Sequence, residues 1–302
     1  MLIHITPRQI RLFITLLITA SLLCSCKGDY MEIAPSQLVV EGWIEHDGFP
    51  VVMVTQSVPL STEPALLDHL ENYIVKWAKV QVSDGENTVV LTGKYDNRYF
   101  PPYIYTTGNL RGMQGKDYTL TVEYGEQTAT ATTHIPAPPY VERIWQEPCP
   151  NNDTLVTYKV RLHDNPNEKN YYQIFCSSRD AQLLQLSATY MGCISDDLID
   201  RSADFTVYRP STAMGEEDHS IYFSSNDKVM IKVAQIDEAS HNFWSDYSQN
   251  MLLSGNLIMS SYQNLRSNIH GGYGIWCGMG CVEASFNTTQ GSQASSPRSV
   301  LP

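Results

Sequence analysis

Basic residues are scarce in this chain. The 302 residues include 20 Lys and Arg against 32 Asp and Glu, which gives a formal net charge of −12. Proteins that bind nucleic acid neutralise phosphates with a basic surface. The acidic balance therefore argues against a nucleic-acid partner.

Catalytic signatures are also missing. The sequence contains no HExxH zinc motif, no GxSxG nucleophile elbow and no P-loop. His163 and Asp164 are adjacent and offer a base with an orienting carboxylate, but no nucleophile can be assigned to them. The turn residues that follow instead indicate the end of a strand. We expect a protein that is not an enzyme.

Metal ligands occur without a recognisable spacing. Calcium prefers several converging carboxylates, and four acidic residues lie close together without the EF-hand pattern: Asp196, Asp197, Asp200 and Asp204. A solvated insertion explains them more simply. The pair Cys277 and Cys281 has no partner CxxC or HxxxH pair for zinc. We expect neither a metal site nor a cofactor.

Long apolar runs are absent after the first 25 residues. No later apolar run approaches the roughly 18 residues of a membrane-spanning helix. At the N-terminus, basic residues precede an apolar stretch over Leu12–Leu23, and the next residues are Cys24, Ser25 and Cys26. Leu at −3 and Ser at −1 before Cys26 are typical of a bacterial lipobox. The pattern predicts a lipoprotein signal peptide over 1–25, palmitate on Cys26 and a polar tether over 26–36. Cys24 is the rival acceptor, and an uncleaved anchor is the alternative.

Five further cysteines follow the leader: Cys149, Cys176, Cys193, Cys277 and Cys281. An exported chain meets an oxidising compartment, so disulfides are allowed, and the odd number leaves at least one cysteine unpaired. Gly278 and Gly280 are suited to a tight turn, so we predict a disulfide between Cys277 and Cys281. The pairing of the other three cysteines stays open.

Alternating apolar residues predict about seven short strands in the first half, near 38–44, 50–58, 75–82, 87–91, 99–107, 117–124 and 127–134. Asp84–Gly85 and Tyr124–Gln127 are turn signals between them, and Pro59–Asn72 reads as a short helical insertion. Seven strands in about 100 residues are typical of an immunoglobulin-like β-sandwich. We assign that domain to residues 37–136.

The proline-rich segment Ile135–Pro139 predicts a domain boundary. Residues 137–286 show further strand patterns, which predict a second β-sandwich domain. One amphipathic helix is expected over Asp237–Met251, with Phe243 and Trp244 on its apolar face. An insertion with some helix is expected over 183–201. Residues 287–302 are rich in Ser, Thr and Gln and are expected to be disordered.

An aromatic cluster offers the clearest candidate for ligand binding. Tyr99, Tyr103 and Tyr105 share one face of an alternating strand. Exposed rings stack well on ligands, but side chains that share one face of an alternating strand are more simply explained by core or edge packing. Packing is the favoured reading, and a binding patch is the alternative.

Seven stretches recur in the order of one known family: Cys26–Lys27, Leu38–Ile44, Ala78–Gly85, Gly115–Val122, Pro136–Pro139, Trp244–Tyr247 and Ser267–Trp276. Together they resemble the Bacteroidota outer-membrane lipoproteins grouped as domain of unknown function 4249. The resemblance implies a lipoprotein at the periplasmic or cell-surface face of the outer membrane, beside a TonB-dependent receptor and without established catalytic residues. It assigns no role to Cys277 and Cys281.

These observations predict a non-enzymatic accessory or ligand-capture component of a TonB-dependent uptake system. One alternative is a surface glycan-binding module, for which the tyrosine cluster has to form an exposed platform. A secreted hydrolase is another alternative, and it requires a cleft with converging His and carboxylate groups.

Overall fold

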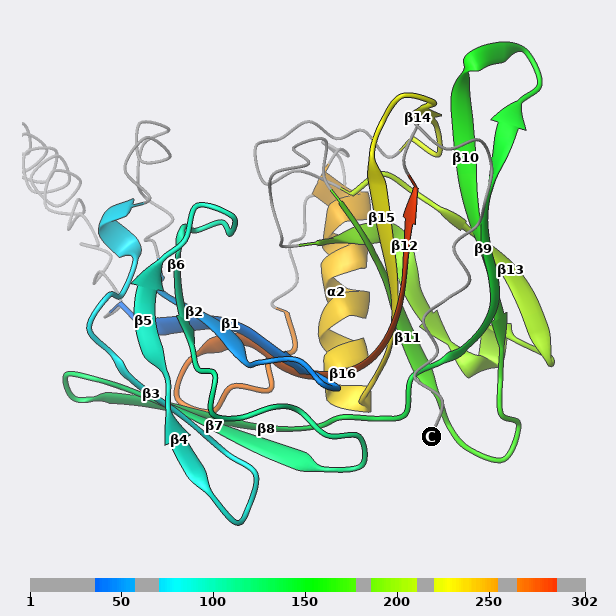
Figure 1. The fold of residues 1–302 in the computed structure, drawn as a ribbon. Coiled ribbons are helices and arrows are strands. Elements are labelled where there is room, and N and C mark those ends of the chain that lie inside the picture. Colours follow the sequence, from blue (N-terminus) through cyan, green and yellow to red (C-terminus); the bar gives the residue numbers. More distant parts are fainter. Residues whose placement is uncertain (1–35, 58–70, 178–185, 211–219, 255–264, 287–302) are drawn as a thin grey trace, which may run out of the picture. The chain divides into compact units, whose positions relative to one another are not determined.

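The computed structural model describes residues 36–57, 71–177, 186–210, 220–254 and 265–286. In these ranges the chain is mainly β, as predicted, with the α-helix α2 (Figure 1). The predicted leader, Cys26, most of the tether, nearly all of the insertion at 59–72 and the 287–302 tail lie outside the described residues.

The largest sheet has eight strands in the order β12-β11-β15-β16-β1-β2-β6-β5. Their bounds are β1 (Leu38–Glu45), β2 (Val51–Gln56), β5 (Thr92–Tyr95), β6 (Tyr103–Thr106), β11 (Tyr171–Cys176), β12 (Ser187–Ser195), β15 (Val229–Ile236) and β16 (Tyr273–Phe286). The last strand, β16, runs parallel to β1 and antiparallel to β15. It therefore joins strands from both halves of the sequence (Figure 1).

A second sheet covers one face of this sheet at the β1 end, in the order β4-β3-β7-β8. Its strands are β3 (Lys79–Ser83), β4 (Thr88–Val90), β7 (Asp117–Tyr124) and β8 (Gln127–His134). Both predicted turns are present, with Gly85 and Gly125 at positive φ, the conformation that favours glycine. Even-numbered residues of β1 pack against Val80, Val82 and Leu120, which confirms the predicted N-terminal β-sandwich.

The core of this first sandwich also needs a residue from the other end of the chain. Trp276 of β16 is fully buried in it, and its indole N–H donates a hydrogen bond of 2.9 Å to the Tyr118 carbonyl. Burial of a large aromatic ring contributes a few kcal/mol, about as much as any single side chain. The first sandwich is therefore completed by the last strand.

A third sheet packs on the β11, β12 and β15 part of the large sheet, which gives the second predicted sandwich. It contains β9 (Tyr140–Cys149), β10 (Asn152–His163), β13 (Ser202–Val207) and β14 (Phe223–Ser224), with β10 at the centre. Alternate residues of β10, among them Tyr158 and Val160, are buried against Ile174 and Val233. Apolar packing against the third sheet therefore covers this face of the large sheet.

Helix α2 (Glu238–Ser254) covers the opposite face of the large sheet, as predicted. Asp237 Oδ1 accepts the backbone N–H of Ser240 at 2.8 Å, a typical N-terminal cap, and Phe243 is buried. The expectation of helix over 183–201 is wrong for most of the described part. Residues 187–195 form strand β12, because they pair with β11, and only the 3₁₀ turn Asp196–Leu198 follows.

The proline-rich connector lies between β8 and β9, where the domain boundary was predicted. The eight-stranded sheet nevertheless continues from one side of this boundary to the other through β16. By their contacts, the described residues between Ser36 and Phe286 form one compact unit. Separate folding of 37–136 and 137–286 stays a prediction.

The predicted disulfide between Cys277 and Cys281 is wrong, because both are free thiols on the continuous strand β16. Residues four apart in a strand lie about 13 Å apart, far beyond the reach of a disulfide. The two glycines between them do not form a turn. They allow the backbone of residues 134–137 to lie close to β16. A Cβ atom at Gly278 or Gly280 would clash with the carbonyl oxygen of His134 or Pro136.

Candidate functional site

The three predicted tyrosines do not form an exposed platform. Tyr105 is only 2% exposed, and its hydroxyl donates to the Val75 carbonyl at 2.8 Å and accepts from the Ala78 N–H at 3.0 Å. Burial raises the pKa of Tyr105 to about 12. Tyr103 packs edge-on against Tyr105, with 5.6 Å between ring centroids. These two side chains are structural, whereas Tyr99 lies elsewhere.

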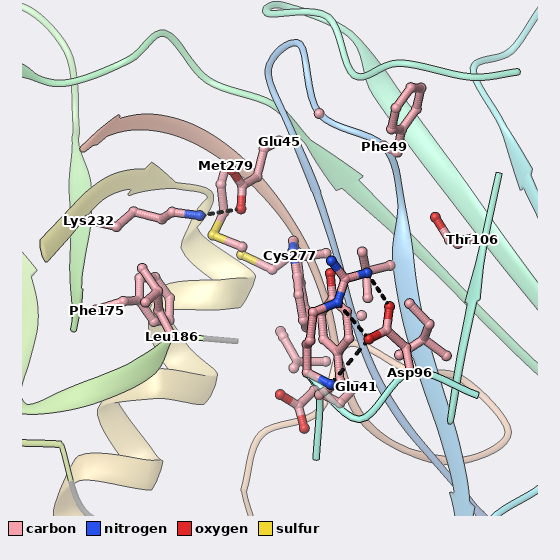
Figure 2. Close-up of a pocket in the computed structure, with 18 of the residues that line it drawn as sticks. Glu41, Glu45, Phe49, Asp96, Thr106, Phe175, Leu186, Lys232, Cys277 and Met279 are labelled. Atoms are coloured by element: carbon pink, nitrogen blue, oxygen red, sulfur yellow. Dashed lines mark hydrogen bonds and ion pairs between the residues drawn. The ribbon is translucent and has the colours of Figure 1, made fainter. Parts of the chain in front are cut away.

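Tyr99 lines a cavity of about 370 Å³ on the face of the large sheet that also carries α2 (Figure 2). Strands β1, β15 and β16 supply its floor, and the segment between β5 and β6 forms one wall. Odd-numbered residues of β1 point to this face because successive side chains of a strand alternate. The same alternation that builds the sandwich core therefore builds the cavity.

Aromatic rings make up much of the wall. Trp43 and Tyr99 lie with ring centroids 6.2 Å apart and planes tilted by 37°. Phe175 and Trp244 meet edge-to-face at 5.5 Å on the α2 side. Phe49 is 38% exposed, and the Arg111 guanidinium stacks 4.2 Å from its ring centroid. Flat apolar surfaces are thus available to a bound molecule.

A buried lysine occupies one side of the cavity. Lys232 Nζ lies 2.6 Å from Glu45 Oε1 and 2.9 Å from Glu283 Oε1. Burial alone would lower the pKa of Lys232, but the attraction of Glu45, together with that of Glu283, outweighs it and raises the pKa. Lys232 is therefore a paired, permanently charged group. In Figure 2 it points directly at Glu45.

A second ion pair lies on the other side of Cys277 in that view. Arg98 donates from Nε to Asp96 Oδ1 at 2.8 Å and from Nη2 to Asp96 Oδ2 at 2.6 Å, and Lys94 Nζ is 3.7 Å from Oδ2. The hydrogen bonds from Arg98 lower the pKa of Asp96 to about 2. This bidentate geometry holds the carboxylate in its ionised form.

Two sulfur side chains, Cys277 and Met279, lie between these pairs. Burial raises the pKa of the Cys277 thiol, and it also raises that of Cys281. Nucleophilic cysteines need a lowered pKa, because the thiolate is the reactive form. Both thiols are therefore inert and apolar, and Cys277 forms part of the cavity wall.

Three members of the predicted acidic cluster, Asp196, Asp197 and Asp204, are engaged in ion pairs. Asp196 and Asp197 lie 3.1 and 2.9 Å from Lys169 Nζ, and Asp204 accepts a 2.7 Å hydrogen bond from Arg161 Nη2. Among the residues that the structure describes, no three His, Cys, Asp or Glu side chains are grouped so as to hold a metal ion.

His163 and Asp164 do not form a catalytic pair. Strand β10 ends at His163, as predicted, and the His163 ring contacts Glu142 at 2.7 Å. Asp164 instead accepts a hydrogen bond from the Tyr172 hydroxyl at 3.1 Å. The two side chains serve different partners.

Sequence reasoning missed most of the cavity. Trp43 was predicted only as part of a strand and Glu45 was not singled out, although their spacing of two residues puts them on one face. Lys232 stands within the apolar strand VMIKVAQI, and a charged residue at such a position is a signal of a buried partner. That partner, Glu45, lies 187 residues away in the sequence.

In the described part of the chain, no helix combines the length and the apolar character that a membrane crossing requires.

Comparison with known proteins adds one relationship. No curated protein is detectably similar to the chain. Residues 28–284, which include all of β1–β15 and most of β16, match a family described as a domain of unknown function. The chain therefore belongs to the DUF4249 family.

Proposed function

We propose that this protein is a lipoprotein of the outer membrane, anchored through Cys26, which captures a ligand as a non-enzymatic accessory component of a TonB-dependent uptake system. The lipobox at Cys26 supports the anchor, and the resemblance of the sequence motifs supports the uptake system. The single observation that carries ligand capture is the cavity of about 370 Å³. Its volume falls within the roughly 300–1,000 Å³ of ligand sites, and it combines aromatic walls with a few polar groups.

The electrostatics of the cavity favour binding over catalysis. General acid–base chemistry needs a group whose pKa lies near the working pH. Asp96, with a pKa of about 2, does not hold a proton at neutral pH, and Lys232 does not lose one. No histidine is among the described residues that line the cavity. A secreted hydrolase is therefore the less favoured reading.

The surface glycan platform is also less favoured. It requires Tyr99, Tyr103 and Tyr105 on one exposed surface, whereas Tyr105 belongs to the sandwich core. Ligand binding by this protein is better assigned to the cavity.

Affinity purification from native membranes tests the proposal. The full-length chain, tagged at its C-terminus and extracted in mild detergent, should recover a TonB-dependent receptor that is absent from an untagged control. A variant with Cys26→Ser should lose the receptor together with the membrane. Recovery of no outer-membrane partner by the wild-type chain would contradict the proposed uptake role.

A further inference from the structure

We infer that the ligand of this cavity is a neutral saccharide, one or two sugar rings in size, which stacks on Trp43 and Tyr99. The inference rests on the proposed capture function, because it names the ligand class of the same site.

The first argument is charge balance. Among the described residues, six charged ones line the cavity, three acidic and three basic: Glu41, Glu45, Asp96, Lys94, Arg98 and Lys232. Lys232 is paired with Glu45, and Asp96 is paired with both Arg98 and Lys94. An ionic ligand gains attraction from one member of such a pair but is repelled by the other, and separating the pair would leave a partly buried charge without its partner, which is strongly unfavourable. The lining therefore selects against a net charge on the ligand.

The second argument is hydrogen-bonding capacity. A carboxylate has about four acceptor sites and a guanidinium has five donors, so pairing leaves part of each unused. Asp96 engages Nε and Nη2 of Arg98, and in the described part of the chain Nη1 has no partner. Arg98 is half exposed, so this donor is accessible. Hydroxyl groups both donate and accept, and can therefore bond to either member of a pair without separating it.

The third argument is shape. A pyranose ring carries an apolar C–H face beside its hydroxyl edges. The tilted rings of Trp43 and Tyr99 supply flat apolar surfaces for that face, and the ion pairs lie beside them. A purely apolar ring would use the aromatic surfaces but make no hydrogen bonds to the ion pairs. Since about 370 Å³ is near the lower end of ligand-site volumes, the occupant is small.

Titration calorimetry tests this inference on the full-length protein, held in a detergent without a sugar headgroup. The probes are glucose, galactose, mannose, maltose, cellobiose and lactose. The charged matches are glucuronic acid, galacturonic acid and glucosamine, which place a carboxylate or an ammonium on the same rings. We expect at least one neutral sugar to bind, and each of the three charged sugars to bind about tenfold more weakly than the tightest neutral sugar or not at all.

Tyr99 and Tyr95 provide a matched pair of variants. Tyr99→Ala removes one stacking ring and should weaken saccharide binding about tenfold. Tyr95 ends β5, is 71% exposed and does not line the cavity, so Tyr95→Ala should change binding less than about twofold. If Tyr99→Ala lowers the Tm, Tyr99→Leu keeps the apolar bulk without the ring and gives the same test.

Tighter binding of a charged sugar, equal effects of the two tyrosine variants, or no binding of any neutral probe would each overturn the inference. These results are separable from the purification experiment. A chain that recovers the receptor but binds no saccharide refutes the ligand class alone. A chain that binds saccharide but recovers no receptor supports the ligand class and contradicts the uptake role.

Discussion

At the scale of single residues, the Lys232 ammonium has two partners that lie far apart in the sequence, Glu45 and Glu283. Its side chain is 13% exposed and contacts carboxylates from two different strands, β1 and β16. It therefore connects the first strand of the described chain to the last one.

Replacement of Lys232 by Met should destabilise the protein. The change leaves Glu45 partly buried beside Glu283 with no cation between them, and we expect a loss of about 2 kcal/mol, below the 3–5 kcal/mol of fully buried pairs. Urea unfolding measures this loss. Lys79→Met is the control, because its pair with Glu123 is exposed and should be worth less than about 1 kcal/mol. Equal losses in the two variants would show that the Lys232 cluster is not special.

Cys26 carries the second residue-scale prediction. Cys26→Ser should abolish labelling by fatty acid and release the protein from the membrane fraction, because the lipobox assigns acylation to this thiol. Cys149→Ser, on β9, should label and fractionate as the wild type does. If Cys24→Ser releases the protein and Cys26→Ser does not, the rival acceptor is the correct one.

At the scale of elements, strand β16 shows how the alternation of side chains along a strand places different residues on its two faces. One face carries Trp276 into the sandwich core, and the other carries Ile275, Cys277 and Met279 to the cavity. The Trp276 face continues in Gly278 and Gly280, where the backbone at 134–137 comes close. The Gly278 N–H donates a 2.7 Å hydrogen bond to Thr133 Oγ1, which holds this contact.

Gly278→Ala should therefore be destabilising even though alanine is small. Its Cβ would overlap the His134 carbonyl, and overpacking of this kind typically costs about 1–3 kcal/mol. Gly108→Ala is the matched control, because nothing lies within 4 Å of a Cβ there. Thermal unfolding followed by circular dichroism compares them, and an unchanged Tm for Gly278→Ala would mean that the close approach is not required.

At the scale of the whole molecule, β16 makes the two halves of the sequence depend on each other. It pairs with β1 on one side and β15 on the other, so one hydrogen-bonded sheet contains strands from residues 38–106 and from residues 171–286. Removal of the last strand leaves the edges of both β1 and β15 unpaired. Such edges are sites of aggregation.

A fragment of residues 36–136 should consequently fail to unfold cooperatively, although the proline-rich connector predicts an independent domain. It lacks Trp276, which fills the core of the first sandwich. The same fragment joined by a flexible Gly/Ser linker to residues 265–286 should recover a cooperative urea transition. A sharp transition of 36–136 alone would restore the domain boundary predicted at Ile135–Pro139.

Local features of this fold were predictable because their causes lie within a few residues. The alternation in β1, the glycine turns at Gly85 and Gly125, and the apolar face of α2 with Phe243 each depend on neighbours in the sequence. Strand β12 was missed because its extended conformation depends on pairing with β11. The predicted Cys277–Cys281 disulfide was wrong because pairing with β1 and β15 holds β16 extended.

The sequence by itself determined the β-rich class, most of the strands, the helix and the position of the connector, since side-chain periodicity reports which face of an element is buried. Only the tertiary structure decided the order of strands in the large sheet, the core position of Trp276 and the cavity with its two ion pairs. The physical reason is distance along the chain. Glu45 and Lys232 meet because two strands 187 residues apart are brought to the same face, and no local pattern carries that information.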